Sequence, residues 1–126
     1  MINLQPTKCN LCGGDVIYTT NDQVYGKKYG SGYCYLCTNC GAYVGTHKPR
    51  PRQALGLLAN AEMRKLKMKC HSLFDKHWNT KFEREGCYIQ LASEMGISLM
   101  DCHFGHFDLS QLKQAYEILQ SWETDK

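Results

Sequence analysis

The second half of the chain repeats apolar residues at three- and four-residue steps, the spacing that places side chains on one face of a helix. The first stripe predicts a helix over residues 53–76. Its members are Leu55, Leu58, Ala59, Met63, Leu66, Cys70, Leu73 and Phe74. A second stripe predicts a helix over Lys81–Met95, which Gly96 is placed to end. A third helix is predicted to begin near Asp108, whose side chain can accept from free amides while Gln111 completes a capping box.

The first part of the chain lacks this period. Residues 1–47 are rich in Gly, Tyr, Thr and Cys, a composition typical of strands and turns. We predict one strand over Asp15–Thr20, ended by the turn signal Asn21-Asp22, and a second over Tyr33–Tyr35. The run from His47 to Arg52 contains two prolines, which exclude helix and favour extended backbone, so we expect a linker there.

Large aliphatic residues are scarce in residues 1–52, and such a segment needs a metal or disulfides to stay folded. The chain offers eight cysteines in 126 residues. No positively charged start followed by an apolar run marks a secretion signal, and no apolar stretch approaches the ~18 residues of a membrane span. We therefore expect a cytoplasmic protein without a membrane partner, in which reduced cysteines bind metal.

One cysteine motif occurs twice in this first part. Its two copies are Cys9-Asn10-Leu11-Cys12-Gly13 and Cys37-Thr38-Asn39-Cys40-Gly41. Two residues between cysteines make a tight turn that points both sulfurs at one ion, and the glycine that follows tolerates a positive φ. Four thiolates satisfy tetrahedral Zn²⁺ and leave no open coordination position. The motif pair predicts one structural zinc ion held by Cys9, Cys12, Cys37 and Cys40.

Four further cysteines stand outside this set. Cys34 forms an alternative pair with Cys37, and a ligand role for Cys34 is the competing interpretation. We favour Cys37 with Cys40 because only that pair repeats the trailing glycine. Cys70 and Cys87 fall on apolar helical stripes, where a free cysteine behaves as a small hydrophobe. Cys102 is likewise separate from the motif pair.

The predicted fold class is α+β, with a small zinc-stapled β lobe of the zinc ribbon or knuckle type followed by three α-helices. Residues 1–52 would form the zinc-binding lobe and a basic linker. Residues 53–126 would form the three-helix region, packed as one unit with the lobe.

Charge is distributed unevenly along the chain. Residues 1–69 carry ten Lys/Arg and three Asp/Glu, whereas residues 70–126 carry five and nine. A basic half suggests an anionic partner such as DNA or RNA. The candidate contacts are His47, Lys48, Arg50, Arg52, Arg64 and Lys65, and the candidate stacking rings are Tyr29, Tyr33, Tyr35 and Tyr43. The alternative is that these charges are an ordinary solvated face and that the tyrosines pack the thin lobe.

A second set of polar residues invites a catalytic interpretation. His71 lies one helical turn from Asp75, and His103 lies three positions from His106. A metal-dependent nuclease would need such groups to converge on one cleft. We favour a packing role, in which His71 and Trp78 tie the first helix to the other two, because no second cluster has a complete metal-ligand set.

Several longer motifs resemble a known family, a group of short, largely uncharacterised zinc-finger-containing proteins found mainly in phages and prophage regions of bacteria. The matching segments are Cys9-x-x-Cys12-Gly13, Tyr25-Gly26, Tyr29-Gly30, Cys37-x-x-Cys40-Gly41-Ala42-Tyr43-Val44-Gly45-x-His47-Lys48, Leu55-Gly56-x-Leu58-Ala59-Asn60-Ala61-Glu62-x-Arg64, His71-x-x-Phe74-Asp75-x-x-Trp78 and Cys102-His103-x-Gly105-x-Phe107-Asp108. The resemblance covers residues 9–120 and implies zinc binding in the cytoplasm of a bacterial host. Cys34 and His106 are additions to the family pattern.

Together these observations predict a non-catalytic structural-zinc module, encoded by a phage, that contacts nucleic acid through a basic surface. A phage protein that binds and modulates a host protein of transcription or defence is the alternative. A metal-dependent nuclease is the third interpretation.

Overall fold

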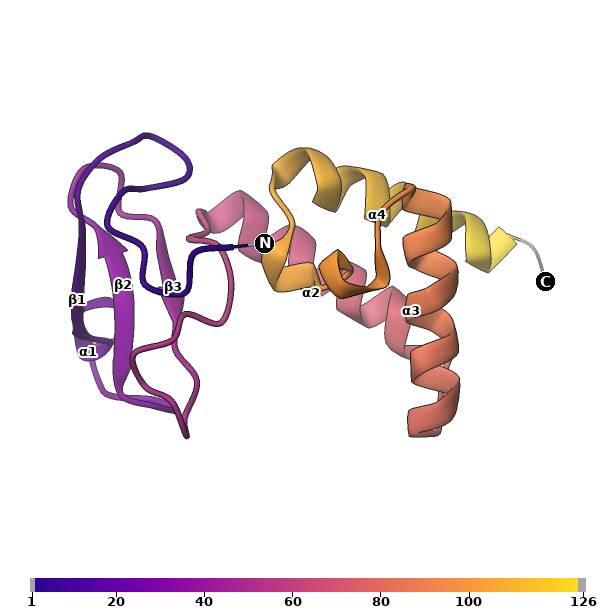
Figure 1. Ribbon diagram of the computed structural model, residues 1–126, viewed down its shortest axis with the longest axis horizontal. Coiled ribbons are helices and arrows are strands. Elements are labelled where there is room, and N and C mark those ends of the chain that lie inside the picture. The colour runs from indigo at the N-terminus through magenta and orange to yellow at the C-terminus, as the bar shows by residue number, and fades with distance from the viewer. Residues whose placement is uncertain (1, 125–126) are drawn as a thin grey trace. The chain divides into compact units, whose positions relative to one another are not determined.

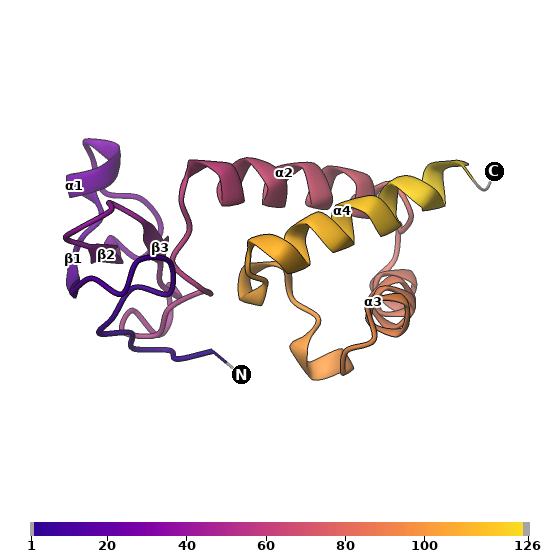
Figure 2. The same ribbon diagram turned by 90° about the horizontal axis from the view of Figure 1, so that it is seen from above.

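The computed structural model describes residues 2–124, which form two compact units (Figures 1 and 2). The first unit ends at Ala61 and the second begins at Glu62, and each is described by itself. The second unit contains the three longer helices. None of the helices in residues 2–124 combines the length and apolar character that a bilayer crossing requires.

The first unit is built on a three-stranded antiparallel sheet in the order β1-β2-β3 (Figure 1). Its strands are β1 (Val16–Thr20), β2 (Tyr33–Cys37) and β3 (Tyr43–Gly45). The first two were predicted, although β2 extends to Cys37, and β3 was missed because it is three residues long. The predicted turn after β1 is instead the start of a one-turn helix, α1 (Asp22–Tyr25), which ends at Gly26.

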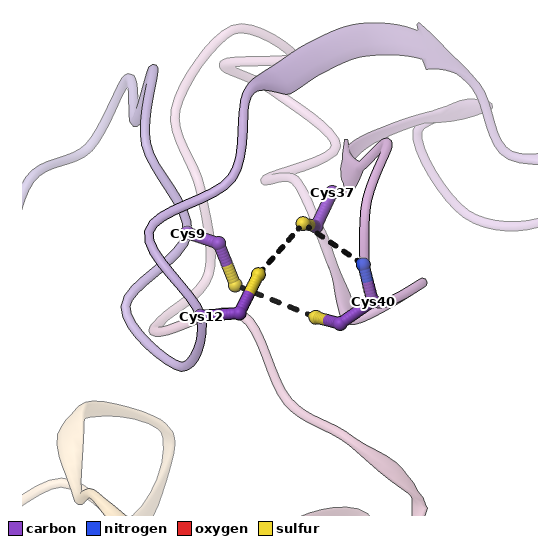
Figure 3. Close-up of side chains that lie close together, drawn as sticks. All are labelled: Cys9, Cys12, Cys37 and Cys40. Carbon is purple, nitrogen blue, oxygen red and sulfur yellow. Dashed lines mark hydrogen bonds between the residues drawn. The ribbon is translucent and has the colours of Figure 1, made fainter.

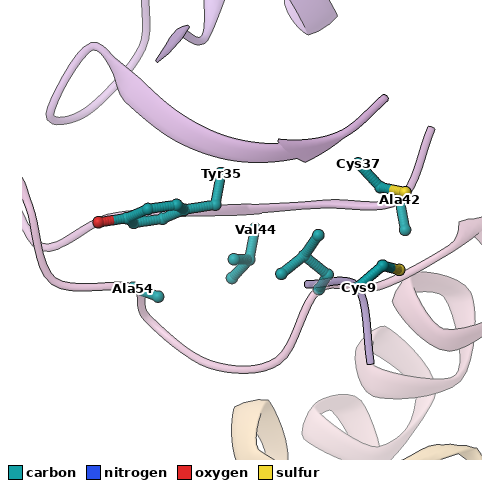
Figure 4. Packing of buried hydrophobic residues seen from close by; sticks show 7 residues of the cluster. Cys9, Tyr35, Cys37, Ala42, Val44 and Ala54 are labelled. Carbon is teal, nitrogen blue, oxygen red and sulfur yellow. The ribbon is translucent and has the colours of Figure 1, made fainter. Parts of the chain in front are cut away.

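The register of the sheet sorts its side chains onto two faces. Tyr18 lies opposite Tyr35, and Tyr35 lies opposite Val44, so these three share one face. That face is covered by a small core (Figure 4). The core consists of Cys9, Tyr35, Cys37, Ala42, Val44, Ala54 and Leu58. Its few large apolar side chains agree with the expectation that this part of the chain needs a metal to remain folded.

The first predicted helix begins later than expected. Helix α2 spans Ala61–Asp75, and the segment before it belongs to the first unit. Ala54 and Ala59 make β-bridges to Thr46 and Tyr43, which places the apolar residues between them against the lobe. The prediction that the helix starts at residue 53 was therefore wrong. The apolar residues of this segment have helical spacing, but the backbone pairs with β3 and the side chains of Ala54 and Leu58 fill the core of the lobe.

The prediction of an extended linker from His47 to Arg52 was also wrong, because residues 46–54 form a closed loop. The bridge between Thr46 and Ala54 closes it, and His47 N donates to Gln53 O at 3.0 Å. Inside the loop, Arg50 N donates to His47 O and Gln53 N donates to Arg50 O. The prolines exclude helix as predicted, but these bonds turn the backbone back on itself rather than extending it.

The other two long helices of the second unit match their predictions closely. Helix α3 spans Lys81–Met95 as predicted, and Gly96 ends it at φ 72°. Helix α4 spans Leu109–Thr124, and Asp108 and Gln111 exchange backbone-to-side-chain hydrogen bonds as the capping box predicted. Two 3₁₀ turns, η1 (Leu99–Asp101) and η2 (Phe104–His106), connect α3 to α4 and were not predicted.

The helices of the second unit enclose a core of their own. Cys70 on α2 donates to Leu112 O on α4, and Phe74 on α2 lies against Trp122 on α4. These two contacts show that α2 and α4 run in the same direction, as Figure 2 shows, while α3 is seen there almost end-on and crosses them. Phe104 from η2 packs edge-on against Phe74 and completes this core.

Candidate metal centre

Four sulfur atoms converge at the end of the sheet in the first unit (Figure 3). The sulfurs of Cys9, Cys12, Cys37 and Cys40 all lie within 4.8 Å of one another. Cys9 Sγ is 3.7 Å from Cys40 Sγ, and Cys12 Sγ is 3.5 Å from Cys37 Sγ. Four sulfurs at about 2.3 Å from a tetrahedral zinc ion are about 3.8 Å apart. The spacing therefore fits one zinc ion at the centre of the set.

The first pair lies on a turn that precedes β1. Gly13 N donates to Cys9 O at 2.9 Å, and Cys9 N donates to Gly14 O at 2.8 Å, which folds the segment into a knuckle. Gly13 has φ 76°, the left-handed conformation that the motif predicted for the trailing glycine. The turn thereby directs the side chains of Cys9 and Cys12 to the same side.

The second pair lies where β2 ends. Cys37 is the last residue of β2, and Cys40 lies in the turn that leads to β3. Gly41 N donates to Cys37 O at 3.2 Å, and Gly41 has φ 80°. The second knuckle therefore repeats the geometry of the first, and the sheet fixes its position.

Gly14 is a site residue that the sequence analysis missed. A Cβ atom at Gly14 would lie 2.6 Å from the Cβ of Asn39 and 3.2 Å from the sulfurs of Cys12 and Cys37. The two knuckles can approach one another only because this position has no side chain. The signal in the sequence was the doubled glycine after Cys12, of which only the first was interpreted.

Polar groups around the sulfurs stabilise their thiolate form. Leu11 N donates to Cys9 Sγ and Gly14 N donates to Cys12 Sγ, both at 3.3 Å. Asn39 contributes its backbone N–H to Cys37 Sγ and its side-chain Nδ2 to Cys12 Sγ, both at 3.4 Å. N–H donors that point at a ligating sulfur stabilise its negative charge.

The thiols of Cys12 and Cys40 differ in how easily they lose a proton before metal binds. The Asn39 side-chain donor, aided by Gly14 N–H, lowers the pKa of Cys12 to about 6. For Cys40 the Ala42 N–H acts to lower the pKa, but desolvation and the neighbouring sulfurs outweigh it and raise the pKa to about 12. Four thiolates this close repel one another, and a divalent cation offsets that repulsion.

The arrangement suits a structural ion rather than a reactive one. Four thiolates fill a tetrahedral shell and leave no position for water or substrate. Cys9 and Cys37 are buried in the small core, whereas Cys12 and Cys40 are exposed. The chain thus holds one structural zinc ion that joins the amino-terminal knuckle to the sheet.

Cys34 is not part of this cluster. It lies three positions before Cys37 on β2, so its side chain points to the opposite face of the sheet. It is buried there, and burial together with the Asp22 carboxylate raises the pKa of its thiol. The alternative in which Cys34 pairs with Cys37 as a ligand is therefore wrong. Cys70 is buried, as expected for a small hydrophobic residue, whereas Cys87 is only half-buried; Cys102 is also buried.

The predicted nucleic-acid contacts lie in both units. His47, Lys48, Arg50 and Arg52 lie in the closed loop of residues 46–54, hereafter the basic loop, and all except the half-buried His47 are exposed. Arg64 and Lys65 lie on α2 in the second unit, where Arg64 is half-buried and Lys65 is exposed. A role of any of these residues in binding nucleic acid stays a prediction.

Two tyrosines anchor the basic loop to the sheet. Tyr18 Oη donates to Pro51 O at 2.7 Å, and Tyr35 Oη donates to Arg52 O at 2.6 Å. The Arg52 guanidinium lies over the Tyr18 ring, 4.6 Å from its centroid. Tyr35 is therefore a buried support for the loop, and its ring is not available for stacking as the sequence analysis proposed.

The histidines of the second unit have aromatic neighbours. His71 packs edge-on against Phe104 with ring centroids 4.6 Å apart, and the ring centroids of His103 and His106 are 4.9 Å apart. Trp78 Nε1 donates to Asp75 Oδ1 at 2.9 Å. Within residues 2–124, the zinc-binding cysteines are the only His, Cys, Asp and Glu group of three or more that is close enough to hold a metal.

Comparison with known proteins gave one match. The model of a family described as a zinc-finger-containing domain matches residues 5–122. No curated protein and no solved structure matches the chain.

Proposed function

We propose, from the premise that this chain belongs to the family of zinc-finger-containing domains, that it is a non-catalytic module whose zinc-stapled lobe contacts nucleic acid through the basic loop. The observation that supports this most is the construction of the loop. Three exposed cationic side chains are held on a closed backbone that two tyrosine hydroxyls anchor to the sheet.

The charge of the first unit favours an anionic partner. Residues 2–61 contain six Lys/Arg and two Asp/Glu, a formal charge of +4. A Zn²⁺ ion with four thiolates adds −2, so the loaded unit carries +2. Asp15 is paired with Lys8, and no acidic side chain in the described chain forms an ion pair with Lys48, Arg50 or Arg52. The Arg52 guanidinium lies over the Tyr18 ring and Arg50 Nε donates to Gln53 Oε1 at 2.8 Å, so both keep a positive charge that no acidic side chain neutralises.

The zinc ion supports this role by rigidity rather than by contact. It fixes the end of β2, and β2 carries Tyr35, whose hydroxyl holds Arg52 O. Cations on an ordered backbone lose less conformational entropy when they bind than cations on a mobile tail. Loss of zinc should therefore weaken binding even though no ligand cysteine touches the nucleic acid.

The test is an electrophoretic shift series with DNA and RNA at several salt concentrations. We expect the variant Lys48→Ala/Arg50→Ala/Arg52→Ala to lose most of the shift and to flatten the salt slope by about 0.7–0.9 per lost phosphate contact. Lys113→Ala, an exposed lysine on α4, is the matched control and should bind normally. Arg64→Ala/Lys65→Ala tests separately whether α2 contributes. Equal affinity and salt slope in the triple variant and the control would contradict the proposal.

A protein partner is the second candidate, and one face of α3 favours it. Phe82 and Ile89 lie seven positions apart, and their side chains are 84% and 56% exposed. Gly86 lies on the same face, where an added Cβ would meet no atom within 4 Å, while Leu91 and Met95 are buried on the other side. Exposed large apolar side chains on one helix face mark contact surfaces. A host protein captured from a bacterial lysate by the wild-type chain but not by Phe82→Ser/Ile89→Ser would support this candidate.

A further inference from the structure

The first unit contains a hollow lined by aromatic rings. Its volume is about 530 Å³, and the side chains that matter here are those of Tyr25, Tyr29 and Leu55. All three are exposed, with between 45% and 51% of their surface open to solvent. Soluble domains normally bury such side chains, so a group of three around one hollow marks a binding surface.

The loop that carries Tyr29 is held in place by a buried asparagine. Asn21 Nδ2 donates to Tyr29 O at 2.7 Å, and Tyr29 N donates to Asn21 Oδ1 at 3.1 Å. Asn21 N also donates to Gly32 O, which closes the loop after the aromatic residue. Asn21 is only 4% exposed, so these bonds are protected from water. The Tyr29 ring is therefore presented to solvent from a fixed backbone.

The rings at the hollow contact one another edge-to-face rather than in a stack. Tyr25 meets Tyr29 edge-to-face with centroids 5.4 Å apart, and it meets Tyr43 edge-to-face at 5.7 Å. Hydroxyl groups lie beside them, since Ser31 and Thr46 contact one another at the same hollow. Flat π-faces with nearby hydroxyls suit a flat, polar-edged ring such as a nucleobase.

Positive charge lies next to the hollow. Lys27 Nζ is 5.2 Å from the centroid of the Tyr29 ring, and Lys28 follows it in the chain. The hollow is also continuous with the basic loop. Thr46, which lines it, forms the bridge that closes that loop. A strand bound along the basic loop would therefore reach the aromatic hollow with its next nucleotides.

Tyr33 points to the core face of the sheet, because it lies two positions before Tyr35 on β2. Tyr33 stacks on Tyr18 with centroids 5.2 Å apart and an interplanar angle of 6°. Tyr18 in turn carries the Arg52 guanidinium. Tyr33, which borders the hollow, is thus connected through the Tyr18 ring to a cation of the basic loop.

We propose that this hollow receives an unpaired base of single-stranded DNA or RNA, with Tyr29 as the principal stacking ring and Lys27 and Lys28 near the phosphates. This inference rests on the proposed function, which it narrows to single strands. Bases in a duplex are already stacked on their neighbours and cannot enter the hollow, whereas a flexible single strand can turn one base into it.

The test compares single-stranded DNA, single-stranded RNA and the matching duplexes, each labelled with a fluorescent adenine analogue, on the zinc-loaded full chain. We expect Tyr29→Ala to weaken single-strand binding about 5- to 100-fold and to leave duplex binding and zinc content unchanged. Tyr29→Phe keeps the ring and should bind as the wild type does. Equal single-strand affinity in Tyr29→Ala and wild type would overturn the inference, as would tighter binding of the duplexes.

A second measurement separates failure of the hollow from failure of the proposed function. If the basic-loop triple variant loses binding but Tyr29→Ala does not, the proposed function stands and the hollow is not a base site. If no nucleic acid binds, the proposed function fails, and a titration with adenosine monophosphate followed by NMR decides about the hollow. Upfield shifts of the Leu55 methyl signals would support a base site, and unchanged signals would overturn it.

Discussion

Loss of one zinc ligand should unfold the first unit and leave the second unit folded. Cys12→Ser is the informative change, because the Cys12 side chain is exposed and contributes little to the packing of the lobe. Any loss of structure must then arise from the metal centre. Leu11→Ser is the matched control, since Leu11 lies in the same knuckle, is also exposed and contributes no side-chain ligand.

The expected magnitude follows from the small core. Tyr35, Val44 and Leu58 are its large side chains, and burying three such groups contributes about 5–9 kcal/mol. Binding of a structural zinc ion contributes about 10–16 kcal/mol near neutral pH. The ion is therefore the larger of the two contributions. Without its complete thiolate shell the lobe would keep only the smaller, apolar contribution, which does not offset the conformational entropy of a folded segment of this length.

The two units carry separate spectroscopic probes. Both tryptophans, Trp78 and Trp122, and the three long helices belong to the second unit, whereas six of the eight tyrosines belong to the first. On chelation, or in Cys12→Ser, the near-ultraviolet tyrosine signal and the amide protection of β1–β3 should fall. Tryptophan fluorescence and helical circular dichroism should remain close to those of the wild type.

Native mass spectrometry provides the accompanying zinc count. The wild type, Leu11→Ser and Cys34→Ala should each carry one ion, because Cys34 points away from the sulfur cluster. If Cys12→Ser retained one tightly bound ion and an intact lobe, the four-thiolate explanation of this fold would be refuted. Loss of the ion from Cys34→Ala would refute the ligand assignment instead.

Three further changes test other parts of the structure. Asn10→Ala should destabilise the zinc-loaded first unit by about 2 kcal/mol in denaturant titration, because Asn10 bonds both N and O of Leu58 at 3.0 Å and its loss leaves them unsatisfied. Gly14→Ala should weaken zinc binding in competition with a chelator, since its Cβ would separate the knuckles; unchanged affinity would argue against that steric role. Burial raises the pKa of the Cys70 and Cys102 thiols to about 11. Because folding favours the neutral form of these thiols, their contribution to the stability of the second unit is fully present below pH 9 and should be lost between pH 9 and 11. Urea titrations followed by tryptophan fluorescence measure this stability, and a value that does not change over that range would contradict the prediction.

Local signals account for the predictions that the structure confirms. The five residues of a Cys-x-x-Cys-Gly turn are sufficient to set its backbone geometry, since Gly13 and Gly41 adopt the positive φ that the motif requires. The end of α3 at Gly96 and the start of α4 at Asp108 are equally local. Each depends on residues within about one helical turn, so the sequence contains the necessary information.

The predictions that failed depend on contacts between distant segments. Leu58 has helical spacing, but Asn10 and the bridge from Ala59 to Tyr43 on β3 hold its segment in a non-helical conformation. Residues 47–52 were expected to be extended, yet the bridge from Thr46 to Ala54 closes them into a loop. Apolar spacing indicates only that a side chain will be buried. The segment against which that side chain packs decides the local backbone conformation.

The sequence by itself determined the zinc ligands, the α+β class and the ends of α3, because each follows from residue types at short, fixed spacings. Only the tertiary structure decided which tyrosines support the lobe and which face solvent. Tyr35 became a buried anchor and Tyr29 an exposed ring because the β2–β3 register and the Asn21 side chain fix their positions. Composition can show that a thin lobe is rich in aromatic rings, but only long-range pairing selects the rings that remain free to bind.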